Sequence, residues 1–180
     1  MKNNSENCQK QEETEVLYDV AKRMLVAAKT APKARGIDNS EIKIVFAETI
    51  RLLSDKMKEI GEKEGQLFFI RDADCILKSP VLLILGTRIK SSGLKKCGMC
   101  GFKNCDDKNK KPNVPCVYNT GDLGIAMGSA VSIAMDNRVD NRIMYTIGQA
   151  ALELKLLGED VRIIYGIPLS ATSKNPFFDR

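Results

Sequence analysis

A chain of 180 residues carries 28 Lys and Arg against 23 Asp and Glu, for a formal net charge of +5 at pH 7. This length suffices for one domain with its own hydrophobic core, so the six cysteines are not needed as disulfide staples. The chain contains no histidine, which excludes Ser-His-Asp and Cys-His nucleophile systems and every zinc site with a histidine ligand. The absence of a Walker sequence and of GxGxxG after a strand leaves nucleoside triphosphates and a Rossmann dinucleotide site without support.

Secretion and membrane insertion are not expected. The opening stretch "MKNNSENCQKQEETE" is polar throughout, and the longest strongly apolar run, residues 81–85, is too short to span a bilayer. We therefore expect a cytoplasmic protein. In that reducing compartment a group of cysteines is more often a metal or redox site than a disulfide framework.

Residues 1–13 are expected to form a disordered polar tail, and residues 14–180 a single domain. Apolar spacing predicts helices over 15–29, 48–65, 122–135 and 141–157, and strands over 42–46, 80–87 and 161–167. Residues 67–70 fit either a short strand or the buried end of a turn. Thr120 is the expected N-cap of the third helix, and Gly65 and Gly158 are expected at helix C-caps.

The strand at 80–87, "PVLLILGT", is almost continuously apolar, which is typical of a strand covered on both faces. Helices that alternate with such strands favour an α+β domain, a layered α/β sandwich. Residues 90–120 interrupt this pattern because they are rich in Lys, Asn, Gly and Pro and poor in core-forming residues. We interpret them as a cysteine-rich, metal-binding insert.

Four cysteines of this insert, Cys97, Cys100, Cys105 and Cys116, have the spacing C-x2-C-x4-C-x10-C. Gly98 and Gly101 allow the backbone to turn closely around sulfur ligands. Disulfides are disfavoured by the compartment, and structural zinc usually takes two similar CxxC pairs. An iron-sulfur cluster tolerates uneven spacing and is the favoured interpretation, with zinc as the alternative metal. Cys75 stands apart and is predicted to be a small core residue.

Positive charge surrounds these cysteines. The lysines of the insert are Lys90, Lys95, Lys96, Lys103, Lys108, Lys110 and Lys111. They fit an ordinary solvated loop, or they offset a negatively charged cluster or steer an acidic electron-transfer partner. Without interleaved aromatic residues, nucleic acid is not an expected partner.

The stretch "CGMCGFKNC" with a fourth cysteine resembles the CGxCGxxxC motif of the small four-iron, four-sulfur domain of anaerobic carbon-monoxide and corrinoid metabolism. From "AAKTAPKARGID" to "GIPLSATSKNPFFDR", the chain also resembles an uncharacterised family of ferredoxin-domain-containing proteins from anaerobic bacteria and archaea. This resemblance implies a [4Fe-4S] cluster on the four cysteines and assigns no reaction.

The order of elements around the insert resembles the flavin-dependent nitroreductase fold, whose members carry FMN at a dimer interface. The resemblance implies FMN contacts from Lys33 and Arg35 in the loop after the first helix, and from Lys174 and Arg180 near the C-terminus. Lys33 and Arg35 also fit ordinary solvated loop charges. The small residues of the helix at 122–135 fit close packing in a core or in a homodimer interface.

Two functional hypotheses follow. The first is an iron-sulfur redox protein, an electron-transfer protein or oxidoreductase with or without FMN, whose partner is an electron-transfer protein or a small redox substrate. The second is a non-enzymatic interaction module that a cluster or a structural zinc ion folds. The sequence identifies no catalytic residue.

Overall fold

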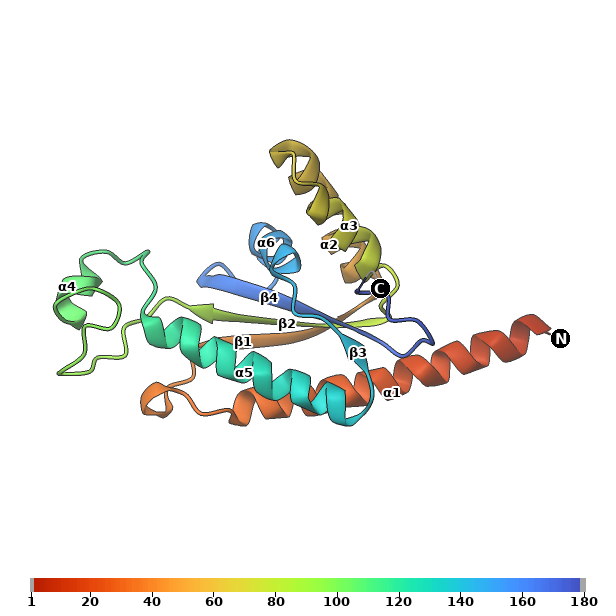
Figure 1. Ribbon diagram of the computed structural model, residues 1–180, viewed down its shortest axis with the longest axis horizontal. Helices are drawn as coiled ribbons and strands as arrows, with labels where there is room; N and C mark the ends of the chain where they lie inside the picture. Colours follow the sequence, from red (N-terminus) through yellow and green to blue (C-terminus); the bar gives the residue numbers. More distant parts are fainter. Residues whose placement is uncertain (1, 179–180) are drawn as a thin grey trace.

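The computed structural model describes the backbone of residues 2–178 and the side chains of residues 10–178. Its centre is a four-stranded antiparallel sheet in the order β1-β2-β4-β3 (Figure 1). The strands are β1 (Ser40–Phe46), β2 (Val81–Arg88), β3 (Asp140–Asn141) and β4 (Val161–Ser170). The chain is therefore a mixed helix and sheet domain, as its sequence predicts.

Helices cover both faces of the sheet. On one face lie α1 (Lys2–Thr30) and α5 (Val117–Asp136), and on the other lie α2 (Ala47–Glu64), α3 (Leu67–Ile76) and α6 (Tyr145–Glu153) (Figure 1). The two shortest elements, η1 (Ala34–Gly36) and α4 (Cys105–Asn109), lie in connections at one end of the sheet.

The continuous apolar run of β2 is explained by this double cover. Leu82 and Ile84 belong to the core beneath α2, α3 and α6, whereas Leu83 and Leu85 belong to the core beneath α1 and α5. Seven of the eight residues of β2 are buried. The predicted cover on both faces is confirmed. The sheet is antiparallel, which does not conflict with the prediction, since an apolar run indicates burial and not strand direction.

Close contact between α6 and β4 depends on glycine. A Cβ atom on Gly148 would lie 1.7 Å from the carbonyl oxygen of Ile164, and one on Gly166 would lie 2.2 Å from Cγ2 of Ile147. Neither distance is available to real atoms, so both positions require glycine. Main-chain hydrogen bonds between Met144 and Gly166 fix the approach of the chain to α6.

Several helix boundaries differ from the sequence predictions. Residues 67–70 begin α3 and do not form a strand. Helix α5 begins at Val117 with Cys116 as its N-cap residue, so the predicted cap at Thr120 is wrong; the Thr120 hydroxyl donates to the Val117 carbonyl inside the first turn. The helix predicted from residue 141 begins at Tyr145, because Asp140 and Asn141 pair with β4.

The sequence predicts a disordered tail over residues 1–13, whereas residues 2–13 belong to α1. Figure 1 shows this helix continuing beyond the edge of the sheet. Its Lys, Glu and Gln residues are good helix formers, so the helix continues where packing against the sheet ends. Cys8 lies outside the residues with described side chains. Within the described part of the chain, none of the helices has the length and apolar character needed to cross a bilayer.

Candidate functional site

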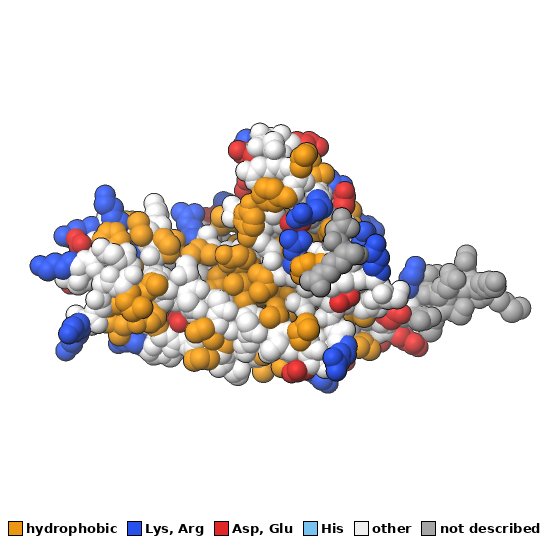
Figure 2. Space-filling model, in the orientation of Figure 1, with side chains coloured by type: hydrophobic (Ala, Val, Ile, Leu, Met, Phe, Trp, Pro, Cys, Tyr) orange, Lys and Arg blue, Asp and Glu red, His pale blue; other side chains and the backbone are white. Residues whose placement is uncertain are grey.

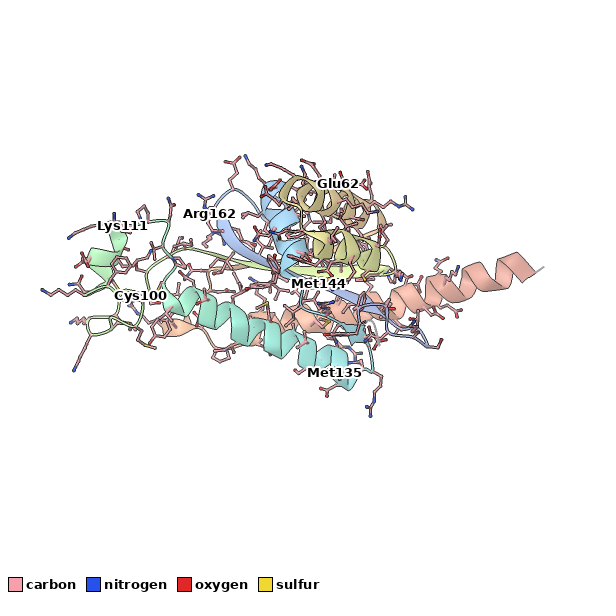
Figure 3. The ribbon with its side chains drawn as sticks, turned by 45° about the horizontal axis from the view of Figure 1, so that its top comes forward. Glu62, Cys100, Lys111, Met135, Met144 and Arg162 are labelled. Atoms are coloured by element: carbon pink, nitrogen blue, oxygen red, sulfur yellow. The ribbon has the colours of Figure 1, made fainter. Side chains whose placement is uncertain are left out.

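The segment from residue 89 to residue 116 connects the end of β2 to the start of α5, and we call it the thiol loop. It contains the four cysteines of the motif and the short helix α4. Figure 1 shows it standing off one end of the sheet. In Figure 3, Cys100 and Lys111 lie at this end, and Met135 lies at the opposite end of α5.

Hydrogen bonds near its start attach the thiol loop to the rest of the domain. The buried side chain of Asn119, in the first turn of α5, accepts a hydrogen bond from the main-chain amide of Lys90 at 3.0 Å. Arg35 donates to the carbonyl oxygens of Ser92 at 2.9 Å and Gly93 at 3.4 Å. The loop is therefore held near its first residues by both α5 and η1.

The η1 segment is itself anchored to α5, because the amide of Ala34 donates to the Asp122 carboxylate at 3.0 Å. Arg35 has a φ angle of 59°, in the left-handed region. The residues on both sides of Arg35 are held by hydrogen bonds, because the Ala34 amide donates to Asp122 and the Gly36 amide donates to the carbonyl of Lys33. Asp122, in the second turn of α5, thus acts on the thiol loop through Ala34 and Arg35.

Within the loop, the "CGMCG" stretch turns on its two glycines. Gly98 and Gly101 have φ angles of 100° and 86°, and the amide of Gly101 donates to the carbonyl of Gly98 at 2.9 Å. Residues with a side chain rarely adopt such angles, so this turn depends on its two glycines. Asn104 caps α4 by accepting from the amide of Asp107 at 2.9 Å.

The four thiols differ in environment. Cys97, Cys100 and Cys105 are half-buried, and Cys116 is buried at the N-terminus of α5. Burial alone would raise the pKa of the Cys116 thiol. Hydrogen bonds from the Ser92 amide and hydroxyl and from the amides of Tyr118 and Asn119 outweigh burial, so the pKa is lowered. A thiolate at this position is stabilised by the protein itself, which suits a metal ligand.

Among the described residues, no three Cys, Asp or Glu side chains are arranged around a position that one metal ion could occupy. The donor set nevertheless fits a thiolate-ligated iron-sulfur group. It supplies four free thiols on one loop, one of them with a lowered pKa, and two glycine turns beside them.

Two of the predicted flavin contacts lie beside the thiol loop. The ammonium group of Lys33 donates to the carbonyls of Ala28, Lys29 and Ala31 at 2.7–2.8 Å, so it caps the C-terminus of α1 with all three of its donors. Arg35 is bound to the loop as described. Both side chains therefore have structural partners, which their positions in the sequence do not reveal.

Lys174, the third predicted flavin contact, lies at the other end of the sheet. Because β2 has eight residues at about 3.3 Å each, its ends are about 23 Å apart. At this far end an open cavity of about 620 Å³ is lined by four cations and two aromatic rings: Arg71, Lys78, Arg142, Lys174, Phe177 and Phe178. Arg180, the fourth predicted contact, lies outside the described residues.

Contacts with the C-terminal segment form the wall of this cavity. Arg142 donates to the carbonyl of Phe177 at 2.9 Å, and its guanidinium lies 5.3 Å from the centre of the Phe178 ring. Asn175 donates to the Asp140 carboxylate at 3.0 Å. Cys75 also lines the cavity, and burial together with the Asp72 carboxylate raises the pKa of its thiol. It is half-buried and packs against the core from the cavity side, so the prediction of a core residue is met only in part.

The sequence did not point to three residues that shape the site. They are Ser92, Asn119 and Asp122, whose carboxylate holds the amide of Ala34. A polar Asn in the first turn of a small-residue helix was the one available signal. Its partner, the amide of Lys90, is 29 residues away in sequence. No local pattern predicts such a pairing.

Comparisons with known proteins agree with this architecture. A family model described as "Uncharacterized protein containing a ferredoxin domain (DUF2148)" matches residues 112–180, which include Cys116 and not the other three cysteines of the loop. An uncharacterised protein of Archaeoglobus fulgidus is 40% identical over 166 residues, covering 87% of this chain and 88% of the relative.

Solved structures with a similar fold include proteins described as nitroreductases and as a flavoprotein. The nitroreductase CinD from Lactococcus lactis, in complex with nicotinic acid, has a TM-score of 0.62 and 11% identity, over 87% of this chain and 79% of CinD. The FMN and NADPH-dependent nitroreductase NfnB of a Sphingopyxis strain has a TM-score of 0.59 and 12% identity, over 89% and 82% of the two chains. A BluB-like flavoprotein from Clostridium difficile has a TM-score of 0.53 and 16% identity, over 87% and 84%.

At these identities the likeness shows the fold alone, which is nitroreductase-like. The archaeal relative, at 40% identity over most of both chains, shows the family. With the family model matched to its C-terminal part, the chain belongs to the DUF2148 family of uncharacterised proteins that contain a ferredoxin domain.

Proposed function

We propose that this protein is a redox protein that binds a [4Fe-4S] cluster through Cys97, Cys100, Cys105 and Cys116. The observation that carries the proposal is the environment of Cys116, where four hydrogen bonds at a helix N-terminus favour the thiolate. The family description as a ferredoxin-domain protein supports it. A bound cluster would supply one-electron transfer.

The protein residues have definable tasks in such a site. Ser92 and the first turn of α5 lower the pKa of the Cys116 thiol, and the glycine turns allow backbone amides to approach sulfur. Asn119 and Arg35 hold the loop against the domain. The lysines of the loop lower the cost of gathering several thiolates in one place.

FMN is the second cofactor that we propose, bound in the cavity of about 620 Å³ at the far end of the sheet. Its volume lies within the range of about 300–1,000 Å³ that is usual for cofactor sites. Lys174, Lys78 and Arg142 can balance a phosphate group, and Phe178 offers an aromatic surface. Several fold neighbours, among them the nitroreductase NfnB, are described with FMN, which supports a flavin on this fold.

We also propose that the protein forms a homodimer through α5. The exposed face of this helix consists of Thr120, Gly121, Gly124, Ile125, Gly128, Ser132 and Met135. Ile125 is 50% exposed and Met135 is 63% exposed, and no charged residue occurs between Asp122 and Asp136. Uncharged small and apolar residues along a helix permit close packing against a second helix.

The cluster is tested by purifying the protein without oxygen and recording its visible spectrum before and after reduction, with iron, sulfide and zinc content. The variants are Cys97→Ser and, as a matched control, Cys75→Ser. A broad visible band that bleaches on reduction, disappears in Cys97→Ser and persists in Cys75→Ser is the expected result. A colourless, folded protein that contains zinc would refute the redox proposal and support a metal-folded interaction module.

FMN is tested in the same samples by its own absorption peaks and by fluorescence titration with added FMN. Lys174→Glu is expected to weaken FMN binding, because the variant places a carboxylate where the phosphate would lie. The control Lys63→Glu changes an exposed lysine on α2 and is expected to leave FMN binding unchanged. Equal FMN affinity in the wild type and Lys174→Glu would remove this cavity from consideration.

A further inference from the structure

We infer that the thiol loop is the docking surface for a small acidic electron-carrier protein. The inference rests on the proposed redox function and adds the chemical class of the partner and the surface that receives it. It is carried by the distribution of charge, the exposure of individual side chains and the attachment of the loop to the domain.

The net charge of the chain is concentrated in the loop. Residues 89–116 contain seven lysines and two aspartates, a formal charge of +5. The whole chain has 28 basic and 23 acidic residues, so the other 152 residues contain 21 of each and are neutral in sum. Figure 2 shows basic side chains spread around this end of the molecule with few acidic ones between them. An acidic protein is therefore attracted to the end that carries the thiols.

The lysines of the loop are also available to a partner. Six of the seven are exposed, Lys108 being the buried one. One ion pair within the loop is present among the described residues, between Lys110 and Asp107 at 3.4 Å. Elsewhere, basic residues of the described chain commonly pair with nearby carboxylates, as Lys58 does with Asp74 at 2.8 Å.

The loop also carries exposed apolar side chains. Met99, between Cys97 and Cys100, is 67% exposed, and Val114 is 38% exposed. The Tyr118 hydroxyl donates to the sulfur of Met99 at 3.6 Å, which holds this flexible side chain in place. An apolar centre with a polar rim is the usual anatomy of a protein interface, and Met is enriched there.

The loop is attached before any partner arrives, since Asn119 and Arg35 fix its start and Cys116 begins α5. A surface that is already ordered loses less conformational freedom on binding. Transient recognition by electrostatic attraction suits an electron carrier, which must associate and leave quickly.

Nucleic acid is a less suitable occupant of the same surface. All basic residues of the loop are lysines, and its one aromatic residue, Phe102, is half-buried. Lysine is a compact, strongly hydrated charge without the bidentate geometry that makes arginine effective on phosphate. Binding of single strands usually requires exposed aromatic rings for base stacking.

The test measures association of the cluster-loaded protein with a purified acidic ferredoxin, without oxygen, by stopped-flow or biosensor kinetics from about 50 mM to about 1 M salt. The variants are Lys95→Glu/Lys96→Glu and, on the other side of the loop, Lys110→Glu/Lys111→Glu. The control, Lys10→Glu/Lys63→Glu, makes the same charge change on α1 and α2, away from the loop. Iron and sulfide content is measured in every sample.

We expect each loop variant to lower the association rate constant about tenfold or more at low salt, and the control to change it less than about twofold. The difference should vanish near 1 M salt, where charges are screened within about 3 Å. Three results would overturn the inference: no salt-dependent binding, an equal loss in the control, or tighter binding of a single-stranded DNA probe than of the ferredoxin.

These results are distinguishable from failure of the proposed function. A protein with full iron and sulfide content that does not bind the carrier retains the redox function and refutes the docking surface. A protein without a cluster that still binds the carrier through the lysines refutes the redox function and supports the docking surface.

Discussion

Asn119 provides the most direct test of how the domain holds the thiol loop. Its side chain is 2% exposed, and its oxygen accepts from the Lys90 amide at 3.0 Å. In Asn119→Ala this amide loses its protein partner, at a cost of about 0.5–1.5 kcal/mol for the lost hydrogen bond. The loop should therefore open about 2- to 12-fold more often.

The assay has two readouts. Denaturant unfolding measures the free energy of unfolding, and amide hydrogen exchange measures the protection of Lys90 itself. The matched control is Asn137→Ala at the opposite, exposed end of α5, where the side chain donates to the Ile133 carbonyl at 2.7 Å. Its effect should remain within about 0.5 kcal/mol. If both variants lose the same stability and Lys90 keeps its protection, Asn119 does not attach the loop.

Three further predictions concern the fold, the dimer and the response to acid. Gly148→Ala should lower the free energy of unfolding by about 3 kcal/mol or prevent folding, because the new Cβ atom would lie 1.7 Å from the Ile164 carbonyl oxygen. An unchanged denaturant unfolding curve would refute this close contact. Ile125→Glu should convert the proposed dimer to a monomer, as measured by light scattering, with helix content unchanged in circular dichroism. Burial raises the pKa of Asp38, but hydrogen bonds from Ser40, with Lys29, outweigh it and lower the pKa below the ordinary value of 3.8. Its stabilisation is thus present above that value and lost as pH falls through the lowered pKa, so Asp38→Asn should unfold with a shallower dependence on acid; an unchanged pH profile would contradict this sign.

The cluster and the flavin, as we propose them, lie at opposite ends of one chain. The thiol loop follows the last residue of β2. Lys174 follows β4, whose last residues pair with the first residues of β2. Helix α5 runs between these ends, from the thiol loop near Cys100 to Met135 (Figure 3), and its C-terminal part contacts β3. Two chains packed antiparallel along α5 would bring the loop of one chain toward the cavity of the other. Cross-linking between engineered cysteines at the two ends would measure this distance.

The amino-acid sequence determined the elements whose signals are local. The alternating strand at 42–46, the doubly covered strand at 80–87 and the helix closed by Gly65 are found as predicted. The signals for these elements lie in the residues themselves and in neighbours a few positions away, which periodicity and backbone preference can report. The glycine turns of "CGMCG" belong to the same class, because a left-handed φ angle is a property of the residue itself.

The tertiary structure decided what depends on partners distant in sequence. Lys33 and Arg35 look like free cations in a loop, yet one caps α1 and the other binds the thiol loop 57 residues away. The lowered pKa of Cys116 requires Ser92, 24 residues earlier, to meet the start of α5. The separation of Lys174 from the thiol loop follows from the length of β2. Such contacts form only when strands and helices pack. Composition and spacing therefore indicate the candidate residues, but their hydrogen-bond partners depend on the tertiary structure.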